Sequence, residues 1–179
     1  AIYAFDLSGI TLHICIIYGW TGGKKGSEAA ARTDDLILII KNEFQAMEPG
    51  PKIIMGDFNA DTDALPTMLL MLEEAGWTDL GAMAHLCTCK PNMPTCHANA
   101  NAKESRIDFI FVNDHLLPAI EMCSVDNDDA FATHRPLKVK VRTTKIAKQF
   151  KTLRKTTNYA EAFEAKVLET VERETEQET

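Results

Sequence analysis

The stretch from Ile53 to Asn59, Ile-Ile-Met-Gly-Asp-Phe-Asn, is the most informative part of this sequence. A short apolar run that ends in glycine is typical of a buried strand. Asp57 and Asn59 follow two residues apart, and along an extended chain period-two geometry places both side chains on the same side. In α/β proteins the end of a buried strand is where ligand sites usually open. A carboxylate and a carboxamide there suit a hard divalent cation and a phosphate oxygen.

The same stretch also begins an alternation of acidic and amide residues that resembles a calcium-binding loop. Asp57, Asn59, Asp61 and Asp63 occupy its first, third, fifth and seventh positions. Such a loop requires glycine at the sixth position and glutamate at the twelfth, and this chain has threonine and methionine there. The element before it is a strand and not a helix. A helix-loop-helix calcium site is therefore not expected.

The pattern around this stretch predicts an α/β layered sandwich. Helical periodicity and turn residues alternate with short β-branched runs in the first half of the chain, whereas the second half contains mainly strands. The expected strands cover residues 10–18, 52–55, 106–112, 120–125 and 137–141, and the expected helices cover residues 29–47 and 65–75.

Two later segments add chemistry to the site. Asp108 lies within an otherwise apolar strand, where a buried carboxylate needs a partner because an unpaired buried charge is costly. His134 lies just before the strand expected over residues 137–141. Asp108 orienting His134, with Asp57 and Asn59 opposite, would create an acid, a histidine and a pole for metal or phosphate.

Composition limits the class of protein. The chain has 179 residues, of which 45% are hydrophobic and 25% charged, so we expect a folded domain. Its net charge of −7 excludes histone-like binding of nucleic acid over the whole surface, but not an enzyme that meets phosphate through a metal. No apolar run approaches the roughly 18 residues of a membrane span, and no secretory signal is visible. The sequence thus predicts reduced cysteines, no membrane partner and a nuclear or cytoplasmic location.

These segments together resemble the endonuclease/exonuclease/phosphatase superfamily, which includes abasic-site endonucleases and deoxyribonuclease I. The stretch 56–59 matches its Gly-Asp-hydrophobic-Asn signature, and 105–110 matches its Ser-Arg-Ile-Asp strand. Thr133-His134 matches the terminal Asp-His, and Tyr18 matches a tyrosine that closes an early strand of the second half. The His-Arg-Pro-Leu ending makes the endonuclease domains of non-LTR retrotransposons the most similar group.

The resemblance implies a partial four-layer α/β sandwich of mixed sheets flanked by helices, with a C-terminal helical extension. Residues 1–142 would be the C-terminal portion of the domain, and residues 143–179 a helical extension or linker. Nothing before Tyr18 corresponds to the family's early asparagine or to its Gln-Glu pair, whose glutamate is a principal metal ligand. Thr133 also replaces the usual acid, and a hydroxyl is a weaker magnesium ligand than a carboxylate.

The resemblance also implies a role for each matching residue. Asp57 would position the attacking water and contact the metal weakly, and Asn59 would hold that water and the phosphate. His134 would stabilise charge on the phosphate in the transition state, with its tautomer fixed by Asp108. Tyr18 would donate a hydrogen bond to a phosphate oxygen. The implied cofactor is Mg²⁺ or Mn²⁺, which would neutralise the phosphate and its leaving oxygen.

The function expected from these features is metal-dependent phosphodiester hydrolysis, in the form of a DNA endonuclease of retroelement type. The expected partners are DNA and, in a full-length protein, a downstream domain of reverse-transcriptase type. Two alternatives stay open. One is a phosphomonoesterase or phospholipid phosphatase of the same fold, and the other is an inactive remnant that serves as an interaction module.

A cluster of cysteines and histidines offers a separate metal hypothesis. Cys87, Cys89 and Cys96 lie close to His85 and His97, so five ligands of the right types for zinc fall in one segment. A Cys-x-Cys pair followed by a long gap and an adjacent Cys-His is not a standard zinc spacing. A variable loop before the Asp108 strand is the competing interpretation.

Overall fold

The structure is a computed structural model, and it describes residues 1–7, 9–83, 85–86, 90–97, 103–126 and 133–146. The chain divides into two compact units, residues 1–148 and 149–179, and every described residue belongs to the first. The C-terminal helical extension predicted over residues 143–179 therefore lies outside the described residues from 147 onward, and so does the Cys87/Cys89 pair.

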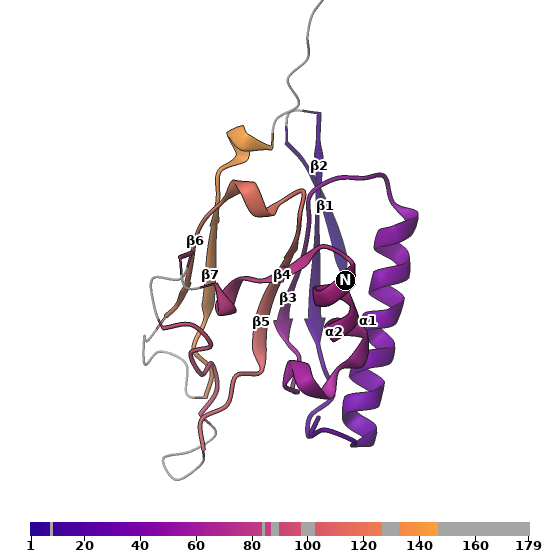
Figure 1. Ribbon diagram of the computed structural model, residues 1–179, viewed down its shortest axis with the longest axis vertical. Helices are drawn as coiled ribbons and strands as arrows, with labels where there is room; N and C mark the ends of the chain where they lie inside the picture. Colours follow the sequence, from indigo (N-terminus) through magenta and orange to yellow (C-terminus); the bar gives the residue numbers. More distant parts are fainter. Residues whose placement is uncertain (8, 84, 87–89, 98–102, 127–132, 147–179) are drawn as a thin grey trace, which may run out of the picture. The chain divides into compact units, whose positions relative to one another are not determined.

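A five-stranded mixed sheet organises the described unit (Figure 1). Its spatial order is β1-β2-β3-β5-β4, in which β2 and β3 are parallel and the other pairs are antiparallel. A parallel pair requires a crossover connection, and a long helix supplies it here. The strands are β1 (Ile2–Asp6), β2 (Thr11–Tyr18), β3 (Lys52–Asp57), β4 (Trp77–Asp79) and β5 (Asp108–Asn113).

Two helices cover one face of this sheet (Figure 1). Helix α1 (Glu28–Ala46) begins after Ser27, whose hydroxyl accepts a hydrogen bond from the Ala30 amide at 3.1 Å. Helix α2 (Pro66–Glu74) has proline in its first turn, where the missing N–H costs nothing. The apolar stripe of α1 and the buried methionines of α2 pack on side chains of β2, β3 and β5 in one core cluster.

A two-stranded antiparallel sheet covers the opposite face (Figure 1). Strands β6 (Ile120–Val125) and β7 (Leu137–Val141) contribute apolar side chains to a second core cluster, which also contains Ile53, Ile110 and Val112 of the large sheet. Because side chains alternate along a strand, the large sheet supplies both clusters from its two faces. Four 3₁₀ helices complete the described unit: η1 (Thr62–Ala64), η2 (Leu80–Ala82), η3 (Leu117–Ala119) and η4 (Thr143–Lys145).

The α/β sandwich predicted from the sequence is confirmed, and the described residues form three of its layers: helices, mixed sheet and small sheet. Two strands were not predicted, the mostly exposed edge strand β1 and the three-residue β4. The strand expected from residue 106 begins instead at Asp108, so this carboxylate lies at the first position of β5 and not in its middle. None of the described helices combines the length and the apolar character that crossing a bilayer requires.

Candidate active site

Three predicted site residues lie in one row across the large sheet. The register pairs Tyr18 of β2 with Asp57 of β3, and Asp57 with Asp108 of β5. Residues paired in this way extend from the same face of a sheet, which here is the face toward β6 and β7. Segments far apart in the sequence thus bring a phenol and two carboxylates to one end of the sandwich.

The end of β3 and the turn that follows it are fixed by a glycine and a buried phenylalanine. Gly56 has a φ of +140°, and a Cβ at this position would lie 2.1 Å from the Ile17 carbonyl oxygen of the neighbouring strand. Only glycine allows so close an approach. Phe58 is fully buried and makes edge-to-face contacts with Phe109 and Phe111 at centroid distances of 5.5 and 5.4 Å. Burial of this ring between Asp57 and the next polar residue anchors both of them to the core.

Asn59 does not continue the strand, so the expectation that it shares the extended geometry of Asp57 is wrong. Strand β3 ends at Asp57, and Asn59 has a left-handed φ of 50°, a conformation that asparagine tolerates. Its backbone amide donates to Asp57 Oδ1 at 2.8 Å, and its side-chain Nδ2 donates to the Gly19 carbonyl at 3.0 Å. Asn59 therefore fixes the Asp57 carboxylate and joins the turn to the loop after β2.

His134 lies against both carboxylates. Its Nδ1 is 3.0 Å from Asp108 Oδ2 and 3.3 Å from Oδ1, while its Nε2 is 3.9 Å from Asp57 Oδ2. A carboxylate only accepts hydrogen bonds, so this contact assigns the proton of the neutral ring to Nδ1 and leaves Nε2 as an acceptor. The imidazole is 37% exposed, so a reacting group can reach it.

Burial raises the pKa of the Asp57 carboxyl. The nearby charge of Asp108 raises this pKa further, whereas the Asn59 amide and His134 lower it. The site thus holds two carboxylates at neighbouring register positions, which is unfavourable unless positive charge is supplied. A cation or a protonated histidine at this position would relieve that repulsion.

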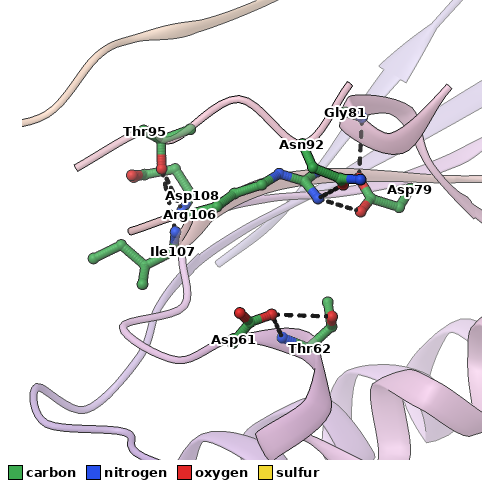
Figure 2. Close-up of polar contacts among 9 residues, drawn as sticks. All are labelled: Asp61, Thr62, Asp79, Gly81, Asn92, Thr95, Arg106, Ile107 and Asp108. Atoms are coloured by element: carbon green, nitrogen blue, oxygen red, sulfur yellow. Dashed lines mark hydrogen bonds and ion pairs between the residues drawn. The ribbon is translucent and has the colours of Figure 1, made fainter. Parts of the chain in front are cut away.

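Asp57, Asp108 and His134 form the one group of metal-capable side chains found among the described residues, with ligand atoms within 4.8 Å of one another. One oxygen of Asp57 is held by Asn59 and the other faces His134. This donor set fits a divalent cation that keeps several waters and takes one or two carboxylates, as Mg²⁺ does. By contrast, Asp61 accepts from the Thr62 amide at 2.7 Å as the cap of η1, which places it in a local turn and not at this cluster (Figure 2).

Tyr18 and a groove lie at the margins of this cluster. Tyr18 is 72% exposed, so its hydroxyl is free to meet a ligand outside the protein. A largely apolar groove of about 320 Å³ opens beside Asp108 and His134, with Met55 and Leu137 in its lining. A substrate therefore has room next to the Asp108 carboxylate and the imidazole.

Sequence reasoning missed the buried ion pair that supports β5. Arg106 donates through Nη1 to Asp79 Oδ2 at 2.7 Å and through Nη2 to Asp79 Oδ1 at 2.5 Å (Figure 2). The side chains of this pair are only 13% and 11% exposed. Arg106 also bonds Asn92 Oδ1 at 2.7 Å and lies 4.5 Å over the Phe109 ring. The sequence did contain a sign of this pair, because Arg106 belongs to the Ser-Arg-Ile-Asp segment and lies two residues before Asp108.

The cysteine- and histidine-rich segment has a structural position in the described part. Cys96 is buried and forms antiparallel bridges with Ser105 on one side and His134 on the other. Burial raises the pKa of its thiol, and the charges of Asp108 and Asp57 raise that pKa further. Next to Cys96, the His97 amide donates to the Thr133 carbonyl at 2.9 Å.

Comparison with known proteins agrees with the fold. The family model described as "Endonuclease/Exonuclease/phosphatase family" matches residues 4–129. The chain belongs to this family. No curated protein matches the sequence significantly.

Solved structures give the same fold at low sequence identity. An AP endonuclease from Archaeoglobus fulgidus superposes with a TM-score of 0.58 and 17% identity, covering 78% of this chain and 64% of that one. The 3′ phosphatase NExo from Neisseria, bound to a product DNA hairpin, gives 0.56 and 16% with the same coverage. This chain therefore spans less than two thirds of the length of either protein. The endonuclease domain of TRAS1, a telomere-specific non-LTR retrotransposon, gives 0.48 and 17%, covering 74% and 57%, which does not single out a retroelement type.

Proposed function

We propose that this chain carries the reaction centre of a metal-dependent phosphodiesterase, and that its substrate is DNA, cleaved endonucleolytically as in retroelements. The observation that carries the proposal is the contact of His134 with Asp108 at 3.0 Å, beside Asp57 at 3.9 Å, at the end of a buried sheet. In this proposal residues 1–142 are the C-terminal portion of the family domain, and residues 143–179 link it to a downstream domain of reverse-transcriptase type.

A divalent ion, Mg²⁺ or Mn²⁺, would be held by Asp57 together with substrate and water oxygens, and it would supply Lewis-acid stabilisation of the phosphate and its leaving oxygen. The chain's own residues orient the reaction. Asp57, with its pKa raised by burial, is suited to accept a proton from a water that Asn59 holds nearby.

His134 would act on the phosphate through Nε2. Asp108 binds Nδ1 and so keeps the ring in one orientation, with Nε2 turned toward Asp57. With a second proton on Nε2, the ring would donate to the equatorial phosphate oxygens, where negative charge grows as the phosphorus is attacked. Tyr18, in the same register row as Asp57 and Asp108, would donate its phenolic proton to a phosphate oxygen.

DNA is favoured as the substrate by the loop that follows Tyr18. This loop carries two exposed lysines, Lys24 and Lys25, and is attached to the site turn by the Gly23 amide, which donates to the Asn59 carbonyl at 3.1 Å. Cations attached to the reaction centre can contact phosphates that flank the cleaved bond. The DNA hairpin named with the Neisseria protein is consistent with such a ligand.

A phosphomonoesterase is the second candidate, because the Neisseria protein of this fold is named a 3′ phosphatase. The same centre would serve a terminal phosphate, including that of a small ester or a phospholipid headgroup. The third reading is an inactive interaction module, motivated by Thr133 in place of the usual acid.

The test is Mg²⁺-dependent nicking of supercoiled DNA by the longest available form of the protein, compared with phosphate release from 3′-phosphorylated DNA and from small monoesters. We expect nicking that Asp57→Ala and His134→Ala each reduce by about 100-fold or more. Glu43→Ala and His115→Ala, which change an exposed acid and an exposed histidine, serve as matched controls and should nick like wild type.

Each alternative has its own outcome. Phosphate release without nicking would replace the phosphodiesterase with the phosphomonoesterase. No hydrolysis of any of these substrates, with Mg²⁺ or with Mn²⁺, would favour the inactive module. Nicking that survives both site substitutions would show that the assigned residues are wrong.

A further inference from the structure

Thr95 occupies a fully buried position between the two segments that carry the candidate catalytic pair. Its hydroxyl oxygen accepts hydrogen bonds from two successive backbone amides, Ile107 at 3.2 Å and Asp108 at 3.0 Å. Figure 2 shows the hydroxyl pointing at both amides from a neighbouring segment. The side chain of Thr95 thus fixes the backbone at the point where β5 begins.

The backbone of Thr95 holds the histidine segment as well. Its carbonyl accepts from the Arg135 amide at 2.7 Å, and its own amide donates to the Ser105 carbonyl at 3.0 Å. The next residue, Cys96, is bridged to both Ser105 and His134. One short extended segment therefore lies between the chain that leads to Asp108 and the chain that carries His134.

The contact between Asp108 and His134 depends on how these two segments are aligned. The residues are 26 positions apart, and their 3.0 Å contact has no turn or helix to define it. A misplacement of about 1 Å in such a constellation can lower a catalytic rate by about 100-fold. Thr95 contacts both segments directly, so it is placed to set their spacing.

We propose that Thr95 is a positioning residue that aligns Asp108 with His134 through its buried hydroxyl. This inference rests on the proposed function for its catalytic consequence, although the alignment itself can be tested without activity. Thr95 touches neither the phosphate site nor the ring of His134 in any described contact, so its effect passes through the backbone of Asp108.

The hydroxyl, and not the shape of the side chain, is what the alignment requires. Valine has nearly the same shape but would leave the part-buried amides of Ile107 and Asp108 without this acceptor, which is unfavourable for both. The start of β5 would move to find water or another acceptor. Serine keeps the acceptor and loses only a methyl group, so it should preserve the position of Asp108.

The experiment compares Thr95→Val, Thr95→Ser and Thr67→Val with wild type. Thr67→Val is a matched control, because it makes the same substitution and removes a hydroxyl that donates to Asp34 at 2.8 Å, between the two helices. Two readouts are taken: kcat and KM for Mg²⁺-dependent DNA nicking, and amide hydrogen exchange of Ile107 and Asp108 by NMR.

We expect Thr95→Val to lower kcat by about 10- to 100-fold with KM changed less than about threefold, the range seen when outer-shell partners are removed. Exchange at the two amides should accelerate in this variant. Thr95→Ser should stay within about threefold of wild type in kcat with both amides protected, and Thr67→Val should do the same.

Unchanged kcat in Thr95→Val, or an equal loss in Thr95→Ser, would overturn the inference, since the hydroxyl would then not matter. If wild type cleaves no substrate, the proposed function fails on its own, and unchanged exchange at Ile107 and Asp108 in Thr95→Val is the result that would overturn the alignment. If Thr95→Val does not fold, Thr95→Cys, which keeps the size and supplies only a weak sulfur acceptor, takes its place with the same readouts and the same criteria.

Discussion

Asp57 and Asp108 are directly paired across the antiparallel strands β3 and β5, with their carboxylates at one end of the sheet. Burial raises the pKa of Asp57, and the charge of Asp108 raises this pKa further. Like charges paired across a sheet are destabilising, so this arrangement is a poor choice for stability alone. It is a suitable one for a centre that recruits a cation or holds a proton.

Asp57→Asn should make the metal-free protein more stable at neutral pH. The pKa of Asp57 is about 3.9 in the unfolded chain and higher in the folded protein. At pH values between these two, the folded state binds more protons than the unfolded state. Stability therefore falls as pH rises through this window and stays lower above it. The asparagine variant has no carboxyl to ionise at this position, so its stability does not fall in this way. We therefore expect its Tm to exceed that of wild type by a few degrees at pH 7, and we expect the difference to shrink as the pH is lowered.

Thermal unfolding without divalent ions between pH 4 and pH 8 measures this effect. Asp35→Asn, which changes an exposed aspartate on α1, is the control and should follow wild type. A lower Tm for Asp57→Asn at neutral pH, or a difference that does not vary with pH, would contradict the explanation.

The ion pair between Arg106 and Asp79 should be the most stabilising charged contact near the site. Its two side chains are almost fully buried, and removal of one partner leaves the other charge without compensation. We expect Asp79→Ala to lower the free energy of unfolding by about 3–5 kcal/mol in urea denaturation. Arg106→Lys should also destabilise the fold, because an ammonium cannot reproduce the two-pronged contact.

An exposed pair on α1 provides the contrast. Arg32 and Glu28 are 2.7 Å apart but solvent-exposed, so Arg32→Ala should cost less than about 0.5 kcal/mol. Equal costs for Asp79→Ala and Arg32→Ala would show that burial does not set the value of the pair.

Two glycines with positive φ separate backbone strain from steric exclusion. Gly56 and Gly22 have φ values of +140° and +88°, but only at Gly56 would a Cβ meet another strand, 2.1 Å from the Ile17 oxygen. Gly22→Ala should cost about 1 kcal/mol for the unfavourable backbone conformation. Gly56→Ala should cost several times more and should abolish activity by separating β2 from β3. Similar melting temperatures for the two variants would refute the steric explanation.

The sequence predicted the elements whose signals are local. The two helices and the strands β6 and β7 are found at or within two residues of their expected ends. Each of the signals that predict them, such as apolar periodicity, the cap Ser27 and the Pro-Gly-Pro stop, comes from residues within or next to the element itself. Strand β1 was missed because four of its five residues are exposed and it is defined only by pairing with β2. Strand β4 was missed because three residues carry no period.

The reactive residues of the candidate site could be predicted from the sequence, but the residues that hold them in position could not. Asp57, Asp108 and His134 were expected and lie together, since each stands at a strand end or beside an apolar run. The roles of Thr95 and Asp79 were not visible, because the partners of Thr95 lie 10 to 40 residues away, Arg106 lies 27 residues from Asp79, and only the folded chain brings them together. For the same reason the left-handed turn at Asn59 overrode the extended geometry expected from spacing alone.

The central claim is that Asp108 and His134 act as one catalytic unit, and a double-mutant cycle on Mg²⁺-dependent DNA nicking tests it most directly. We predict that Asp108→Ala and His134→Ala each reduce the rate by about 100-fold or more and that the double variant is no slower than His134→Ala alone. Losses that multiply in the double variant, or single variants that nick at the wild-type rate, would contradict the claim.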